Sequence, residues 1–564
     1  MNKKKLRWAV LSVLLTIVFS FPLLVILAAD GIFLDGTQPG ELSSNPLDPP
    51  GCGCHKTFDA SSFHEPWDTW AGSMMAQAAR DPIYWATLDI AEQDVPTVGD
   101  FCIRCHSPLG WLEGRSGPPG DPPFDGSLLT GDDFEGVFCD FCHRMYEGPS
   151  PPPYTENGQY WISLLTEKRG PYSDSTPPHG AIYSPDFHVN STICGVCHNV
   201  TNPLINLVDD TGADTGLKFP IERTYKEWLQ SDYGDPVSPD YTTCSECHQP
   251  SVLDKKAAGG GAPVRAEVPM HQFAGGNVWM MDLLKVEESG LGRDENFDWT
   301  KAQALDMLQT KSATMALGLP PSVEEGYLMA VDVTITNLTG HKLPTGYPEG
   351  RRMWLNLTAS DVGSGVFFES GAYDTGTAVL TQDPQVKIYE AKPGIWGTGP
   401  TFNFVLNNYY PKDNRIPPLG FVPDIETEPK GYSYPDLGGG VLAHYDTTTY
   451  LVPVPLGVTD PVTVTATLRY QSSSKEYIDF LVSENTTTTR GTEMQTLWET
   501  YGKSAPVDMV SQSGAVPANL CASGVPPDTF LLVDKTGFVA LDWTPEANTA
   551  FYRVYRYTLP DMSD

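Results

Sequence analysis

Cysteine and histidine recur in this sequence at one fixed spacing, C-x-x-C-H. Four segments carry it: Cys102-Ile-Arg-Cys105-His106, Cys139-Asp-Phe-Cys142-His143, Cys194-Gly-Val-Cys197-His198 and Cys244-Ser-Glu-Cys247-His248. This spacing is the attachment signature of c-type haem. The two thiols add to the two vinyl groups of the porphyrin, and the histidine directly after them becomes the proximal ligand of the iron. The four segments therefore predict four covalently attached haems.

Paired cysteines have two other common uses, and neither explains the adjacent histidine. C-x-x-C pairs occur in zinc sites, and cysteines of exported proteins form disulfides. Neither use requires a histidine directly after the second cysteine. Histidine is only 11 of the 564 residues, so its presence after all four pairs is not expected by chance. The pattern therefore favours haem over zinc or a disulfide framework.

A fifth segment, Cys52-Gly-Cys54-His55, has one residue fewer between its cysteines. Cys54 could form one thioether with His55 as proximal ligand. Whether Cys52 reaches the second vinyl group is open, and the alternative is that both cysteines are unattached. The segment lies 50 residues before the next motif, and the later motifs are 37, 55 and 50 residues apart. This regular spacing favours a fifth haem, and leaves Cys521 as a free thiol or an intermolecular partner.

Six histidines outside the motifs are candidates for the second axial ligand that a low-spin haem iron needs, usually His or Met. Their positions in the sequence indicate which of them are the better candidates. His179 and His188 lie in a Pro/Gly-rich loop before the third motif, and His271 follows the last motif. His341 lies on a tight turn after a predicted strand. The remaining two are His64, a further candidate, and His444, interpreted as an ordinary histidine.

Residues 66–80 add methionine to these candidates. Their apolar side chains recur at helical spacing, which predicts a helix that Asp81-Pro82 ends. Met74 or Met75 could bind an iron, although a methionine on an apolar helical stripe is more often a core residue.

The charge balance excludes one broad class of protein. The formal net charge is -34, from 36 Lys and Arg against 70 Asp and Glu. A general nucleic-acid binder needs basic side chains that neutralise phosphates, so no nucleic-acid partner is expected. With 40% apolar residues, the chain can bury a core.

The N-terminus predicts export. Basic residues, from Lys3 to Arg7, precede an apolar run from Trp8 to Ala29, which is typical of a signal peptide. The run of 22 residues is also long enough to span a bilayer uncleaved, so a cleaved signal and an anchor both stay open. Either places the protein in the periplasm, at the cell surface or outside the cell, with membrane contact only through this segment.

The periodicity of apolar residues changes along the chain, and predicts two kinds of domain. Helices are expected at 66–80, 83–93, 225–230, 299–317, 475–481 and 492–501. Period-two alternation predicts strands at 328–336, 353–359, 366–370, 385–389, 402–406, 449–454 and 462–470. The expected fold class is a loop-rich α multihaem cytochrome domain followed by an antiparallel β-sandwich domain.

The expected organisation has five parts. They are a signal peptide or anchor at 1–29, a multihaem domain at 45–280, a helical connection at 281–320, a β-sandwich at 321–510 and a segment at 530–564. Residues 537–556 of the last segment resemble the first two strands of a fibronectin type III module, which is either truncated or completes another sheet.

Several strings beyond the haem motifs resemble exported multihaem cytochromes of the cytochrome c-554/c-prime type. They are 70–82, 99–111, 222–232 and the turn 339–346 with Arg351 or Arg352. In that family a Ser-x-His-Ala string supplies a distal histidine, and here Ser73-Met-Met75-Ala76 stands at its place. The resemblance therefore implies an axial role for Met75 rather than Met74, and distal roles for His188 and His271. The C-x-C-H spacing at Cys52 departs from the family pattern.

These features predict a carrier of single electrons, exchanging them with redox partner proteins or a membrane donor outside the cytoplasm. A reductase of a small nitrogen or sulfur oxyanion is the enzymatic alternative. It would need one iron with an open coordination site, and the supply of spare His and Met does not require one. Self-assembly into a haem-stacked filament is the structural alternative.

Overall fold

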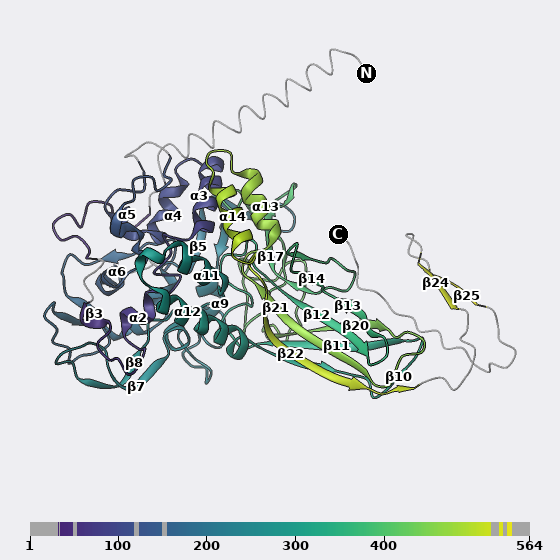
Figure 1. The fold of residues 1–564 in the computed structure, drawn as a ribbon. Coiled ribbons are helices and arrows are strands. Elements are labelled where there is room, and N and C mark those ends of the chain that lie inside the picture. Colours follow the sequence, from purple (N-terminus) through teal and green to yellow (C-terminus); the bar gives the residue numbers. More distant parts are fainter. Residues whose placement is uncertain are drawn as a thin grey trace, which may run out of the picture.

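The computed structural model describes residues 32, 34–48, 53–117, 123–148, 155–519, 529–533 and 539–543. The predicted export segment at 1–29, Cys52 and Cys521 lie outside these residues. Within them, no helix combines the length and apolar character needed to cross a membrane. Helices and short ribbons gather on one side of the molecule, and the long strands on the other (Figure 1).

The N-terminal half, which contains the cysteine motifs, is built from short helices. Proline and side-chain caps start several of them: Pro82 is the first residue of α3, and Asp81 accepts a hydrogen bond from Ile83 N at 2.9 Å. The helices are α2 (Pro66–Trp70), α3 (Pro82–Asp94), α4 (Val98–His106), α5 (Pro108–Leu112), α6 (Cys139–Arg144), α7 (Pro185–Val189), α8 (Thr192–Gly195), α9 (Thr224–Leu229), α10 (Cys244–His248), α11 (Trp279–Glu287) and α12 (Asp294–Asp306), with 3-10 turns at Gly53–His55, Gly131–Glu135 and Ser289–Leu291.

Two-stranded ribbons join these helices where the sequence analysis expected only loops. Buried and exposed residues do not alternate regularly in these strands, so the period-two pattern is weak: residues 219–221 are all buried, and residues 251–256 include no fully buried one. The ribbons are β1 (Met145–Tyr146) with β2 (Trp161–Ile162), β3 (Lys168–Gly170) with β4 (Ala181–Tyr183), β5 (Val200–Val208) with β6 (Asp214–Glu222), and β7 (Ser251–Lys256) with β8 (Val264–Pro269).

The two largest sheets of the C-terminal half are antiparallel. One has the order β20-β11-β9, from β9 (Ala313–Gly318), β11 (Leu328–Asn337) and β20 (Tyr445–Pro453). The other has the order β13-β12-β21-β22, from β12 (Arg352–Asp361), β13 (Gly365–Ser370), β21 (Val462–Gln471) and β22 (Val507–Val516), and β16 (Ile388–Tyr389) also pairs with β12.

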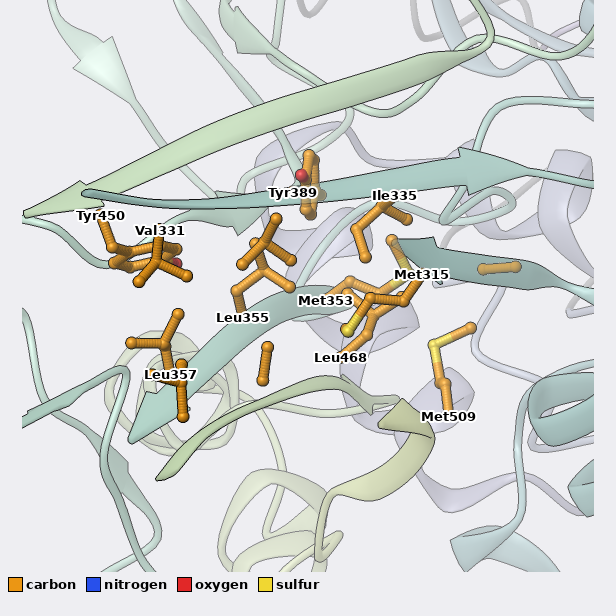
Figure 2. Packing of buried hydrophobic residues seen from close by; sticks show 14 of the residues in the cluster. Met315, Val331, Ile335, Met353, Leu355, Leu357, Tyr389, Tyr450, Leu468 and Met509 are labelled. Carbon is orange, nitrogen blue, oxygen red and sulfur yellow. The ribbon is translucent and has the colours of Figure 1, made fainter. Parts of the chain in front are cut away.

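Both sheets contribute to one hydrophobic core. Alternate residues of β11, including Val331 and Ile335, are completely buried, as the period of two requires. Leu355 of β12 and Leu468 of β21 belong to the same cluster. Figure 2 shows these side chains pointing toward one another between the strands. The assignment of a particular β-sandwich fold, and of the domain boundaries, stays a prediction.

The remaining elements of the C-terminal half lie outside these two sheets. Two helices, α13 (Lys475–Glu484) and α14 (Arg490–Thr500), pack against α3 of the N-terminal half (Figure 1). There Tyr477 Oη lies 2.7 Å from Thr87 Oγ1, and Arg490 pairs with Asp89 at 2.7 Å. The smaller strands are β10 (Val323–Glu324), β14 (Tyr373–Asp374), β15 (Val379–Leu380), β17 (Ala391–Ile395), β18 (Gly399–Pro400), β19 (Tyr409–Asp413), β23 (Ala518–Asn519), β24 (Thr529–Val533) and β25 (Val539–Trp543).

The helix expected at 299–317 is confirmed in its first part and wrong in its last part. The helix α12 ends at Asp306, a π-helical turn covers Met307–Lys311, and Ala313–Gly318 is strand β9. This strand pairs with β11, with Met315 opposite Ile335. Tertiary pairing therefore overrides the local helical pattern.

Two further expectations also fail. The helix at 66–80 ends at Trp70, because residues 71–80 bond locally: Gln77 donates its side-chain amide to Ala71 O at 2.8 Å. The strand at 402–406 is a turn. Its Val405 carbonyl accepts from Asn202 Nδ2, at 2.8 Å, rather than from a neighbouring strand.

Candidate multihaem site

The cysteine motifs of the N-terminal half surround one cavity of about 2830 Å³. Ordinary small-molecule pockets are roughly 300–1,000 Å³, so this space is far larger than one small ligand needs. Its wall includes all nine described cysteines: Cys54, Cys102, Cys105, Cys139, Cys142, Cys194, Cys197, Cys244 and Cys247. It also includes nine histidines: His55, His106, His143, His179, His188, His198, His248, His271 and His341.

Backbone carbonyls orient the motif histidines. The Nδ1 atoms of His55 and His248 lie 2.8 Å from Ala257 O and Ala274 O, respectively. The same contact is made by His143 Nδ1 to Arg169 O at 2.6 Å, and by His106 Nδ1 to Ala78 O at 3.3 Å. A carbonyl partner fixes the proton on Nδ1 and leaves Nε2 as the metal ligand. These four histidines therefore have the tautomer that a proximal haem ligand requires.

Burial favours the neutral form of four motif histidines, which is the form that binds iron. It lowers the pKa of His106 to about 4. It also lowers the pKa values of His143, His198 and His248. Together with the oriented Nδ1 atoms and the paired thiols, this environment fits c-type haem.

The motifs are contiguous in space, and the third lies between the first and the fourth. A side-chain hydrogen bond joins Cys105 to Cys197, lowering the pKa of Cys105 and raising that of Cys197. A second bond joins Cys194 to Cys244, raising the pKa of Cys194. Cys142, of the second motif, is close enough to both cysteines of the third to raise their pKa values as well. The chain thus brings four sequence segments to one continuous site.

Two of the predicted distal histidines have the same orientation as the proximal ones. His271 Nδ1 lies 3.2 Å from Pro269 O, and its ring centroid is 6.1 Å from that of His143. His341 Nδ1 lies 3.0 Å from Lys342 O. Both side chains line the cavity, and burial lowers their pKa values, to about 3 for His271 and about 4 for His341.

The other candidate histidines differ in their surroundings. His188 lines the cavity 6.0 Å from the ring of His143, but its Nε2 already contacts Cys142 O at 3.1 Å. His179 lies on the wall but is exposed, with Nδ1 2.7 Å from Gly180 O. His64 is completely buried and, among the described residues, its Nε2 has no hydrogen-bond partner, but it does not line the cavity. Neither does His444.

Met74 and Met75 both line the cavity. Met74 also packs against a hydrophobic cluster that contains Trp279 and Ile478, which is the role of a core residue. Met75 accepts a backbone hydrogen bond from Val137 N at 2.9 Å, two residues before the second motif. The axial role of Met75 stays a prediction.

Sequence reasoning missed several groups of the wall. Tyr84 stacks on His106, with ring centroids 3.9 Å apart and planes 7° from parallel. Two carboxyl groups, Asp81 and Glu349, also line the cavity, and burial raises their pKa values to about 6 and about 8. Tyr84 and His106 are far apart in the sequence and Glu349 comes from the other half, so no local pattern could have identified them.

The comparisons with known proteins add little to this geometry. No family model matches the chain, and no curated protein matches it. A crystal structure of a penta-heme cytochrome c552 from Thermochromatium tepidum is similar, with 17% sequence identity and a TM-score of 0.47, covering 85% of this chain and 99% of that one. A likeness of this size assigns neither family nor function, and the resemblance to the c-554/c-prime family stays a prediction.

Proposed function

We propose that this chain is a multihaem c-type cytochrome that carries single electrons between redox partners outside the cytoplasm. The observation that carries the proposal is the convergence of four C-x-x-C-H segments on one cavity, with the motif cysteines of neighbouring segments in contact. Haems attached at such segments lie next to one another, so an electron can pass between them without leaving the protein. The apolar N-terminal run supports export, where haem attachment and partner exchange would take place.

The chain's own residues have defined tasks in this proposal. The paired cysteines attach each porphyrin, and the following histidine binds its iron. Backbone carbonyls such as Ala257 O and Ala274 O hold these imidazoles in place. The attached haems supply the one-electron chemistry, and the surrounding protein keeps water from the irons and tunes their potentials.

The mass of the mature protein, purified with its haem, tests the proposal. We expect the mass of four haems, or of five if Cys54 is attached, and complete reduction of all of them by one electron donor. A Cys54→Ala variant separates the two counts, because it removes one haem only if that site is used. A mature protein with fewer than four haems would contradict the proposal.

A reductase of a small nitrogen or sulfur oxyanion is the second candidate. The cavity wall favours it, because Tyr347 and Arg351 line the cavity, and the pKa of Tyr347 is raised, mainly by burial, with a smaller contribution from the Cys102 thiol. Electron paramagnetic resonance distinguishes the two functions. Uniformly low-spin irons support the electron carrier, whereas a high-spin iron whose signal changes with nitrite, hydroxylamine or sulfite supports the reductase.

A further inference from the structure

The turn that carries His341 belongs to the β-rich half but forms part of the wall of the haem cavity. It follows β11, and Thr339, Gly340 and His341 all line the cavity. Each half of the molecule therefore contributes metal-binding side chains to one space. We propose that His341 is the second axial ligand of the iron attached at Cys244, Cys247 and His248, and that Glu227 positions it. The inference rests on the proposed haem attachment.

Packing places this turn against the fourth motif. A Cβ atom on Gly340 would lie 3.1 Å from Trp228 Cδ1 and 3.4 Å from Tyr233 Cβ. Trp228 donates its indole N–H to Thr242 O at 2.8 Å, two residues before Cys244. These distances are at or below ordinary van der Waals contact, so the turn packs closely on this surface and holds His341 near the fourth attachment site.

The imidazole of His341 has the orientation of a ligand. Thr339 Oγ1 and Lys342 O lie 3.2 and 3.0 Å from its Nδ1. No described residue hydrogen-bonds to its Nε2, so that atom is available to a metal in the cavity. His248 is close enough to add to the lowering of the pKa of His341, which is mainly due to burial. Both imidazoles line the same cavity, one from each half of the molecule.

Buried charges fix the backbone on the C-terminal side of His341. Glu227, on α9, accepts hydrogen bonds from Lys342 N at 3.1 Å and Thr345 Oγ1 at 2.9 Å, and pairs with Arg415 at 3.0 Å. Lys342 Nζ binds Asp413 at 2.7 Å. The side chains of Glu227 and Lys342 are completely inaccessible. Such a network is costly to bury unless every member is paired, and here its members lock the turn to α9.

Neutral hydrogen bonds hold the turn on both sides of His341. Asn337 Nδ2 donates to His341 O at 2.8 Å and to Ile416 O at 2.9 Å. Backbone bonds also pair Leu343 with Ile416 at 2.9 Å in both directions. The histidine thus lies on a rigid support before any cofactor binds, which is the arrangement expected of a preorganised ligand.

Spectroscopy of the haem-loaded protein tests the ligand. We expect His341→Ala to convert one iron from low to high spin, and added imidazole to restore it. His341→Met should keep that iron low-spin and raise its potential, because thioether ligation favours the reduced state. His444→Ala is the matched control, a histidine of the same half outside the cavity, and should leave the spectrum unchanged. If both His341 variants keep the wild-type number of low-spin irons and the wild-type haem potentials, the proposal is overturned.

A variant without the fourth haem, Cys244→Ala with Cys247→Ala, tests the pairing. Adding His341→Ala to it should produce no new high-spin iron, whereas a new signal would assign His341 to another haem. Electron cryomicroscopy of the wild-type haem-loaded protein decides the same point directly. If the wild-type mass shows no haem, the proposed function itself fails; if haems are present and His341 variants are silent, only this inference fails.

The positioning role of Glu227 has its own readout. Glu227→Ala should lower the affinity of the iron for His341, so that a fraction of the same iron becomes high-spin, with the effect greatest on heating. Glu227→Gln keeps an acceptor oxygen and should retain most of the low-spin signal. If Glu227→Ala lowers stability without changing the spin state, Glu227 is structural and that part of the proposal is wrong.

Discussion

The two halves of this protein differ in what fills their interiors. In the β-rich half, side chains of facing strands such as Val331, Leu355 and Leu468 are completely buried against one another (Figure 2). In the half with the cysteine motifs, short helices and ribbons surround a cavity of about 2830 Å³. One interior is packed by the chain itself, as protein cores are. The comparison suggests a test of the proposed function, in which haem would fill the space that side chains fill in the β-rich half.

Preventing haem attachment tests this difference with the largest expected effect. The protein expressed without the c-type maturation machinery should lose ordered structure around the cavity, because the side chains of its wall would face water instead of packing against haem. The sheets that contain β11, β12 and β21 should stay folded. Hydrogen exchange followed by mass spectrometry measures both halves at once, and equal protection in the two halves would refute the distinction.

Truncating a side chain in the hydrophobic core of the β-rich half should have the next largest effect. Leu355→Ala removes a fully buried side chain from β12, and such changes cost about 2–5 kcal/mol. Urea unfolding followed by near-ultraviolet circular dichroism gives the change in free energy. Leu328→Ala, at a position 61% exposed on β11, is the control and should be nearly neutral. Similar losses from both variants would mean that this core is not the source of stability.

Glu349 belongs to the β-rich half but lines the cavity of the other half. Its ionisation should make the free energy of unfolding depend on pH. Burial raises its pKa from 4.5 to about 8, although nearby Arg351 opposes this shift. Between these two values the folded state keeps a proton that the unfolded state releases, so stability should fall as pH rises, by up to about 1.4 kcal/mol per pH unit.

Glu349→Gln should flatten this dependence and stabilise the protein above pH 8. Urea unfolding measured from pH 5 to pH 9 compares the variant with the wild-type protein. Exposed Glu499 provides the matched control, and Glu499→Gln should keep the wild-type slope. A Glu349→Gln protein with that same slope would show that the carboxyl group is ionised in the folded state.

Surface ion pairs should show the smallest effect and no difference between the halves. Lys285 pairs with Asp298 at 2.6 Å in the N-terminal half, and Arg469 pairs with Asp508 at 2.9 Å on the β side. The two aspartates are 60% and 61% exposed, and exposed pairs contribute about 0–1 kcal/mol. Asp298→Asn and Asp508→Asn should each shift thermal unfolding only slightly. A large shift in one half alone would extend the comparison to the surface.

Prediction from the sequence was most successful where a residue pattern states the structure directly. Period-two alternation located β11, β12 and β21 to within a few residues, because one face of each strand is buried. It failed at residues 313–317, which form a strand only because β11 lies beside them. It also missed the ribbons of the N-terminal half, because buried and exposed residues do not alternate regularly in their strands.

The sequence by itself determined which chemistry is predicted for this protein. Each C-x-x-C-H segment predicts haem attachment and proximal ligation within five consecutive residues, so this prediction needs no knowledge of the fold. Only the tertiary structure decided how these segments combine: which motifs touch, which of the spare histidines face the cavity, and that His341 reaches it from the other half. Those are distances between residues far apart in the chain, and they follow from the packing of both halves rather than from any local pattern.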